Sequence, residues 1–131
     1  MTKTETRYLK QHLKMDCGIA ALGTLLGRSY RMTFAAVILS SEKKPWCIGH
    51  SVGVHAVELI QAARFLAYDF QKTRLTRCRN LAKVPNNSLV FQPPEEGRCG
   101  HWIVKIDNRF WCPARGFLST PRVSSYLCLK T

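Results

Sequence analysis

The sequence predicts an α+β fold in one domain, with helices in the first half and an antiparallel sheet in the second. The chain has 131 residues, the length of a single domain, and 46% of them are hydrophobic, which is enough for a buried core. Apolar residues recur with a helical period up to about residue 66, and short apolar strands separated by turn clusters follow from Ser88. We therefore expect a helical layer at about 1–67 and a sheet layer at about 68–131.

Three helices are expected in the first half. Asp16 stands where a side-chain cap is needed for a helix that begins at Cys17, and Gly27 stands where that helix would end. A second, short helix is expected from near Thr33, and a third at about 53–66, because apolar residues line one face of each.

Four strands are expected in the second half, at Ser88–Gln92, 100–106, Arg109–Cys112 and 123–129, with PPEEG and PARG as turn clusters. Asp107 and Asn108 form a plausible two-residue hairpin turn, because both residue types tolerate positive φ. Helices followed by an antiparallel sheet predict two segregated layers with a cleft between them.

Composition and charge exclude several classes of protein. Lys and Arg number 20 against 8 Asp and Glu, so the formal net charge is +12. The longest apolar run, residues 34–39, is far shorter than the ~20 residues of a membrane-spanning helix. The N-terminal residues are polar and lack the apolar stretch of a secretory signal. We expect a cytoplasmic protein without a membrane span.

The six cysteines are Cys17, Cys47, Cys78, Cys99, Cys112 and Cys128. Without an export signal, and with a chain long enough for a core of its own, reduced thiols are favoured over disulfides. No CxxC pair occurs, so the common zinc and redox spacings are absent. We expect no metal and no other cofactor.

Positive charge is concentrated in two stretches. Lys3, Arg7, Lys10 and Lys14 have a spacing that would line one helical face. A second stretch contains no acid and holds Lys72, Arg74, Arg77, Arg79 and Lys83. Either stretch could bind a polyanion, or it could be a solvated surface of a basic protein, since no nucleic-acid motif accompanies it.

Cys17 is the candidate nucleophile. It opens a helix, where unpaired N–H groups and the helix dipole favour a thiolate. Asp16 works against this by adding negative charge, so Cys17 needs a cationic partner. His101, which begins a strand in the other layer, can supply it as the second member of a Cys–His pair. The plainer reading of Cys17 is a small buried hydrophobe.

Hairpin geometry predicts the neighbour of His101. A turn at residues 107 and 108 places Ile103 opposite Cys112, and strand parity then puts His101 and Cys112 on one face as diagonal neighbours. Cys112 therefore occupies the position of the residue that orients the imidazole. Asp107 lies roughly 20 Å along the strand and cannot serve.

The motifs QHLKMDCGIAAL, GHWIVKI and CPARG together resemble the papain-like cysteine peptidases that process the double-glycine leaders of bacteriocins, and their stand-alone relatives. The resemblance covers nearly the whole chain. In that family a Gln six residues before the nucleophile helps to form the oxyanion hole, and Gln11 stands six residues before Cys17. His101 matches the family histidine, and Cys112 replaces the Asp that orients it.

The resemblance implies a papain-like fold and a thiol hydrolase, namely a cysteine peptidase that cleaves a peptide bond. Cys17 would be the nucleophile and His101 the general base and acid, while the Gln11 side chain and the Cys17 N–H would stabilise the oxyanion. Cys112 would support His101 only weakly, because a thiol is a weak hydrogen-bond acceptor. The source would be a bacterium or a phage.

Two alternatives stand beside this reading. The first is a decayed papain-like pseudoenzyme, a basic binding module for nucleic acid or an acidic protein through Lys72, Arg74, Arg77 and Arg79. The second is a zinc site with Cys17, Cys99, His101 and Cys112 as ligands. It predicts bound zinc and unreactive thiols.

Overall fold

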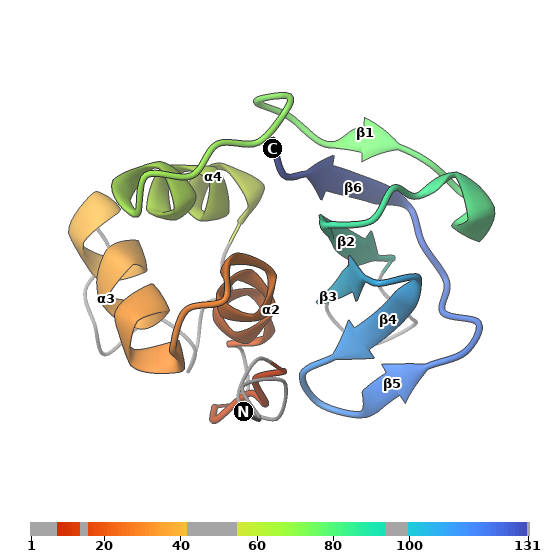
Figure 1. Ribbon diagram of the computed structural model, residues 1–131, viewed down its shortest axis with the longest axis horizontal. Helices are drawn as coiled ribbons and strands as arrows, with labels where there is room; N and C mark the ends of the chain where they lie inside the picture. The colour runs from red at the N-terminus through yellow and green to blue at the C-terminus, as the bar shows by residue number, and fades with distance from the viewer. Residues whose placement is uncertain (1–7, 14–15, 42–54, 94–99, 131) are drawn as a thin grey trace.

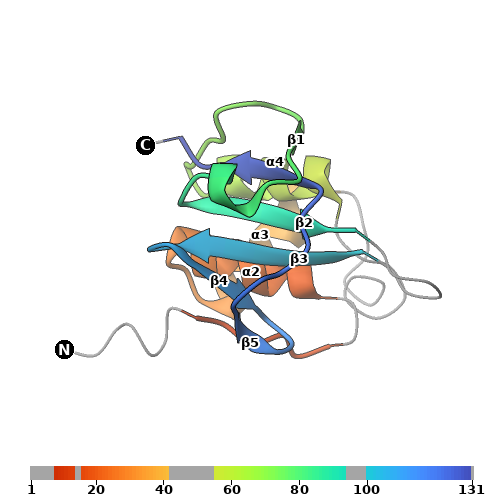
Figure 2. The same ribbon diagram turned by 90° about the vertical axis from the view of Figure 1, so that its right-hand side faces the viewer.

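The computed structural model describes residues 8–13, 16–41, 55–93 and 100–130. Within them, three α-helices precede a six-stranded antiparallel sheet, which confirms the α+β class. The helices form one layer and the strands the other (Figures 1 and 2). Helix α2 (Cys17–Leu26) lies against the sheet, while α3 (Tyr30–Ser40) and α4 (Ala56–Phe65) lie beyond it (Figure 1).

Helix α2 has the predicted position, and all of its residues after Cys17 are buried because it lies between the strands and the other helices. Gly27 ends it with a left-handed φ of 69°. The expected side-chain cap is wrong: Asp16 has φ −106° and ψ 20°, outside the extended region that aims a side chain at the first turn. Its Oδ2 instead accepts the N–H of His12 at 2.9 Å and the hydroxyl of Tyr30 at 2.5 Å.

The other two helices differ from the prediction at their starts. Helix α3 begins at Tyr30 rather than near Thr33, because Oγ of Ser29 accepts the N–H of Met32 at 3.1 Å and caps the helix there. Helix α4 begins at Ala56, and residues 53 and 54, where it was expected to begin, lie outside the described residues.

The strands run in the order β1-β6-β2-β3-β4-β5 across the sheet. Their bounds are β1 Thr76–Arg77, β2 Ser88–Gln92, β3 His101–Ile106, β4 Arg109–Cys112, β5 Gly116–Leu118 and β6 Ser125–Cys128. Strands β2 and β4 match the prediction, and β3 is one residue shorter at its start. Strand β6 is shorter than the expected 123–129, since Leu129 pairs only with Phe70 in an isolated bridge.

The β3–β4 hairpin has the predicted turn and register. Asp107 and Asn108 have φ of 52° and 61°, and Val104 lies opposite Trp111. The sheet continues beyond β4, however. The chain turns at residues 113–115 and returns as β5, which the sequence analysis missed together with β1 and the short 3-10 helix η1 (Leu81–Lys83).

Two apolar clusters pack on the two faces of the sheet. The larger lies between helices and sheet and includes Leu22, Leu59, Trp102 and Val104. The smaller lies on the opposite face and contains Val84, Val90, Ile103, Phe110, Cys112 and Val123. Alternate residues of β3 thus belong to different clusters, as the period of a strand requires. Within the described residues, no helix is long and apolar enough to cross a membrane.

Residues 8–13 connect the two layers without forming a helix, so the helical face expected around Lys10 is wrong in this segment. The N–H of Leu9 donates to Oγ1 of Thr24 on α2 at 2.9 Å, and its carbonyl accepts Nε1 of Trp111 on β4 at 2.8 Å. These bonds satisfy backbone N–H and C=O groups of a segment that belongs to no helix or strand. Lys3, Arg7 and Lys14 lie outside the described residues.

Candidate active site

The thiol of Cys17 meets the first peptide of β3. Cys17 is the first residue of α2 and is half-buried. Its Sγ accepts the backbone N–H of Trp102 at 3.5 Å, a contact across 85 residues of sequence. Since this amide belongs to the peptide bond that joins His101 to Trp102, the two layers bring the candidate nucleophile to the residue beside the candidate base.

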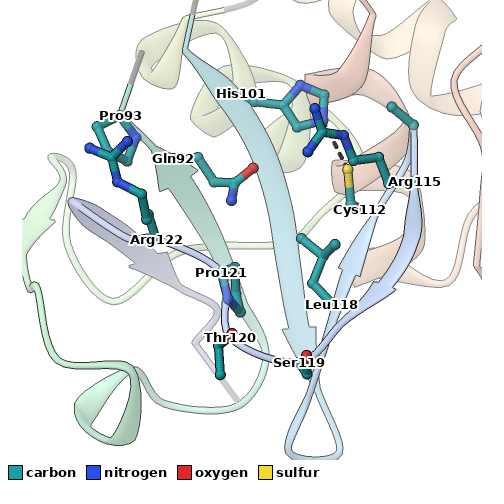
Figure 3. Close-up of a pocket in the computed structure, with 11 residues that line it drawn as sticks. Gln92, Pro93, His101, Cys112, Arg115, Leu118, Ser119, Thr120, Pro121 and Arg122 are labelled. Atoms are coloured by element: carbon teal, nitrogen blue, oxygen red, sulfur yellow. Dashed lines mark hydrogen bonds between the residues drawn. The ribbon is translucent and has the colours of Figure 1, made fainter. Parts of the chain in front are cut away.

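His101 contacts the thiol that strand parity predicts. Its Nε2 lies 3.2 Å from Sγ of Cys112 (Figure 3). This confirms that the two residues are neighbours on one face of the hairpin. The hydrogen bonds of the described residues include none between His101 and Cys17. Because Cys112 contacts Nε2, Nδ1 is the ring nitrogen of His101 that remains available to exchange a proton.

Burial favours the neutral forms of both candidate catalytic groups. It raises the pKa of the Cys17 thiol, which hydrogen bonds from the Trp102 and Gly18 amides lower and the charges of Asp16 and Cys112 raise again. Burial, and then the positive charge of Arg115, lower the pKa of His101. The resting site therefore favours a thiol and a neutral imidazole over the ion pair expected from the sequence.

Cys112 is buried at the end of β4. Its side chain is 1% exposed and packs in the cluster on the sheet face away from the helices. The next residue, Pro113, accepts the backbone N–H of Gln11 at 3.1 Å. Segment 8–13 thereby fixes the chain immediately after the thiol that contacts His101.

Gln11 lies next to this turn. Its backbone bond to Pro113 places it beside Cys112, and its side-chain Nε2 donates to the carbonyl of Leu13 at 3.0 Å. Gln11, Cys17, His101 and Cys112 thus belong to one region, although they come from four different segments of the chain. The oxyanion role of Gln11 stays a prediction.

Two aromatic side chains, which the sequence analysis did not single out, support the residue before Cys17. Tyr30 donates its hydroxyl to the buried Asp16, and the ring of His12 stacks on Tyr30 with 4.2 Å between centroids. Burial, then the bond to Asp16 and its charge, raise the pKa of Tyr30. The bond between Tyr30 and Asp16 joins the start of α3 to the start of α2. The spacing of residues in the sequence does not predict this contact.

A pocket of about 440 Å³ opens beside His101 and Cys112 (Figure 3). Its other walls come from the end of β2, the β4–β5 turn and the segment after β5, and include Gln92, Arg115, Leu118, Thr120 and Arg122. Cys17 and Gln11 are not among its lining residues. Arg115 belongs to the predicted PARG turn, and no sequence pattern points to Arg122.

The proposed zinc ligands do not gather among the described residues. Cys17, His101 and Cys112 form no group that could hold a metal ion, and Cys99 lies outside the described residues. Cys17, Cys78, Cys112 and Cys128 are free thiols.

The second basic stretch lies on the surface at the β1 edge of the sheet. The side chains of Lys72, Arg74, Arg77 and Arg79 are all exposed. Lys72 and Arg74 line one hollow of about 150 Å³, and Arg77 and Arg79 line another of about 640 Å³. Neither hollow includes a residue of the Cys17 site.

The site consists of two contacts near the ends of α2, β3 and β4: the Cys17 thiol with the Trp102 amide, and the His101 ring with the Cys112 thiol. A half-buried thiol at a helix N-terminus is suited to nucleophilic attack when an imidazole is within reach to accept its proton. No protein-family model matches the chain, and a search of the curated proteins found no match.

Proposed function

We propose that the protein is a papain-like thiol hydrolase, a cysteine peptidase with Cys17 as nucleophile and His101 as general base and acid. The observation that carries the proposal is the bond from the Trp102 N–H to Sγ of Cys17. It supports a helix-terminal thiol held against the peptide that follows His101, with residues of two layers meeting at one point. The thiol requires a reducing compartment such as the cytoplasm.

In this mechanism Sγ of Cys17 attacks the carbonyl carbon of the scissile peptide while its proton passes to Nδ1 of His101. The same proton then goes to the leaving amine, and a thioester remains on Cys17. Water, deprotonated by His101, hydrolyses the thioester and restores the thiol. Because burial lowers the pKa of His101 and raises that of Cys17, proton transfer accompanies attack and does not precede it.

The test is cleavage of a peptide library by the wild-type protein and by Cys17→Ala, followed by mass spectrometry. Removal of the nucleophile should abolish cleavage and change the unfolding free energy by no more than about 1 kcal/mol. Cys128→Ala is the matched control, since Cys128 is also a half-buried free thiol but lies on β6. Equal cleavage by Cys17→Ala and the wild type would exclude the mechanism.

A second candidate function is a basic binding module. It is supported by the exposed cations of the second basic stretch and by pKa shifts that favour a neutral thiol and imidazole. Binding of a 20-nucleotide single strand should then weaken steeply with salt, with a log–log slope of about −0.7 for each phosphate neutralised. Replacement of Arg77 and Arg79 by Gln should reduce the slope, and a slope near zero would remove this candidate.

A further inference from the structure

The pocket beside His101 carries two arginines that the catalytic proposal does not use. Arg115 comes from the β4–β5 turn and lies on the His101 side of the pocket, while Arg122 follows β5 and lies by Pro93 on the other side (Figure 3). Both side chains are exposed, and neither forms an ion pair within the described part of the chain. Two guanidinium groups therefore flank one hollow without a counter-charge from the described lining residues.

The remaining lining residues suit a carboxylate on a short aliphatic stem. Gln92, Ser119 and Thr120 offer polar side-chain groups that make no hydrogen bond with other described residues. Leu118 and Pro121 add an apolar wall. A guanidinium binds a carboxylate through two parallel, charge-assisted N–H···O bonds. This bidentate pairing is the strongest interaction that a lining side chain of the pocket can make with a carboxylate.

The positive charge of this pocket extends to the candidate base. Arg115 acts on His101 strongly enough to lower the pKa of the imidazole, second only to burial. A carboxylate bound at Arg115 would offset that charge. An occupied pocket therefore makes the imidazole a better proton acceptor than an empty one.

We propose that this pocket is a specificity subsite that binds an Asp or Glu side chain of the peptide substrate beside His101. The inference rests on the proposed peptidase function and adds the chemical class of the substrate. A peptide acid is favoured over a nucleic-acid strand because the pocket is a single hollow of about 440 Å³, within the size range of small-ligand sites. A strand would instead need a charged groove that follows its backbone.

The first experiment maps cleavage sites in a proteome-derived peptide library by mass spectrometry, with Cys17→Ala as the blank. The wild type should show Asp or Glu enriched at one fixed position near the cut. In Arg115→Gln and Arg122→Gln that enrichment should fall about tenfold, the effect of one lost charge-assisted bond pair. Arg31→Gln is the matched control, because Arg31 is an exposed arginine on α3 outside the pocket and should leave the enrichment unchanged.

Cleavage that depends on Cys17 but has no acidic preference would overturn the subsite and leave the peptidase proposal intact. If no cleavage depends on Cys17, the peptidase proposal fails, and binding still tests the pocket. The probes are the capped hexapeptide Gly-Ala-Glu-Glu-Ala-Gly and its counterpart with Gln in place of Glu, titrated while the His101 ring signals are followed by NMR.

The pocket is supported as a carboxylate site if the His101 signals shift with the Glu peptide and not with the Gln peptide. These shifts should be lost in Arg115→Gln and in Arg122→Gln. Equal responses to the two peptides, or no response to either, would overturn it. A 20-nucleotide strand that competes with the Glu peptide at these two arginines would also overturn it, since the pocket would then be part of a polyanion site.

Discussion

Cys112 holds His101 by a contact that differs chemically from the one a carboxylate would make. Its Sγ lies 3.2 Å from Nε2 of the ring. A thiol is a weak donor and a weak acceptor, and it carries no charge in its protonated form, whereas a carboxylate accepts strongly and stabilises an imidazolium. At this position a thiol stabilises the cationic form of the ring less than a carboxylate would.

Cys112→Asp should raise both the pKa of His101 and the rate of peptide cleavage, because a carboxylate at Nε2 favours the imidazolium that forms during attack. Burial of the new charge should lower the unfolding free energy by about 1–3 kcal/mol. The His101 pKa is read from an NMR titration of the ring, and the rate from hydrolysis of a cleaved library peptide. Cys112→Asn, which has nearly the same shape and no charge, is the control. The same His101 pKa in both variants would contradict this account.

Cys17 should be alkylated slowly in the native protein. Burial raises its pKa, so its thiolate fraction at pH 8 is smaller than that of an ordinary thiol. Labelling with iodoacetamide, resolved by site through mass spectrometry, should show Cys17 reacting more slowly than Cys128 and still accelerating at pH values where ordinary thiols are fully ionised. His101→Ala should leave this rate nearly unchanged. Fast labelling below pH 8 that is lost in His101→Ala would instead demonstrate a preformed ion pair.

Strand parity sufficed to predict the contact of His101 with Cys112, because a two-residue turn leaves a single register for the hairpin. The partners of Asp16 could not be predicted in this way. Capping is a local signal, whereas Tyr30 reaches Asp16 from another helix, a choice made by tertiary packing. The pocket arginines were likewise missed, since Arg122 joins the site only through the path that the chain takes after β5.

At the scale of whole elements, the predicted segments are those with a clear apolar period. Helix α2 and strands β2, β3 and β4 have long apolar faces and were located to within one residue. Strand β1 has only two residues and β5 only three, and β5 begins at Gly116, which has φ of 88°. Segments this short have no period, so only pairing with a neighbouring strand defines them.

The start of β3 is sensitive to a single methyl group. A Cβ at Gly100 would overlap the ring of Phe91, which packs edge-on against Trp102 with 5.0 Å between centroids. Gly100→Ala should therefore displace Phe91 and lower the unfolding free energy by about 1–3 kcal/mol, measured by thermal or urea unfolding. Phe91→Leu in the same chain removes the overlapping ring atoms and should restore part of the loss. A double variant no more stable than Gly100→Ala would show that the ring is not the cause.

For the whole molecule, stability should be greatest between about pH 7 and 9. The raised pKa values of Cys17 and Tyr30 mean that the folded state holds these protons more tightly, so their contribution is lost as pH rises. The lowered pKa of His101 has the opposite sign, and its contribution is present above the ordinary histidine pKa and lost as pH falls. Unfolding temperatures measured across pH 5–11 should show both losses, the alkaline limb of the profile and the acid limb.

Two variants test which residue causes the loss of stability at alkaline pH and which causes it at acid pH. Tyr30→Phe should flatten the alkaline limb while costing about 1–3 kcal/mol at neutral pH, because Asp16 loses a hydrogen-bond donor. His101→Gln should flatten the acid limb. An alkaline limb equally steep in Tyr30→Phe and the wild type would show that Tyr30 does not set it.

Fold class followed from the change of period along the chain, but the strand order did not. Strand β6 lies between β1 and β2, so a segment near residue 126 separates two strands that come earlier in the sequence. Both the β1–β6 pair and the β2–β6 pair join residues far apart along the chain. The apolar period of a segment carries no information on which distant strand it pairs with.

The bond between Cys17 and Trp102 also determines when the proposed nucleophile becomes competent. It joins residues 85 apart, one in the helical layer and one in the sheet. Such a contact requires two distant segments to come together, which costs loop-closure entropy. A chain in which β3 has not yet docked against α2 lacks this contact, so the proposed nucleophile reaches its folded environment only when both layers have assembled.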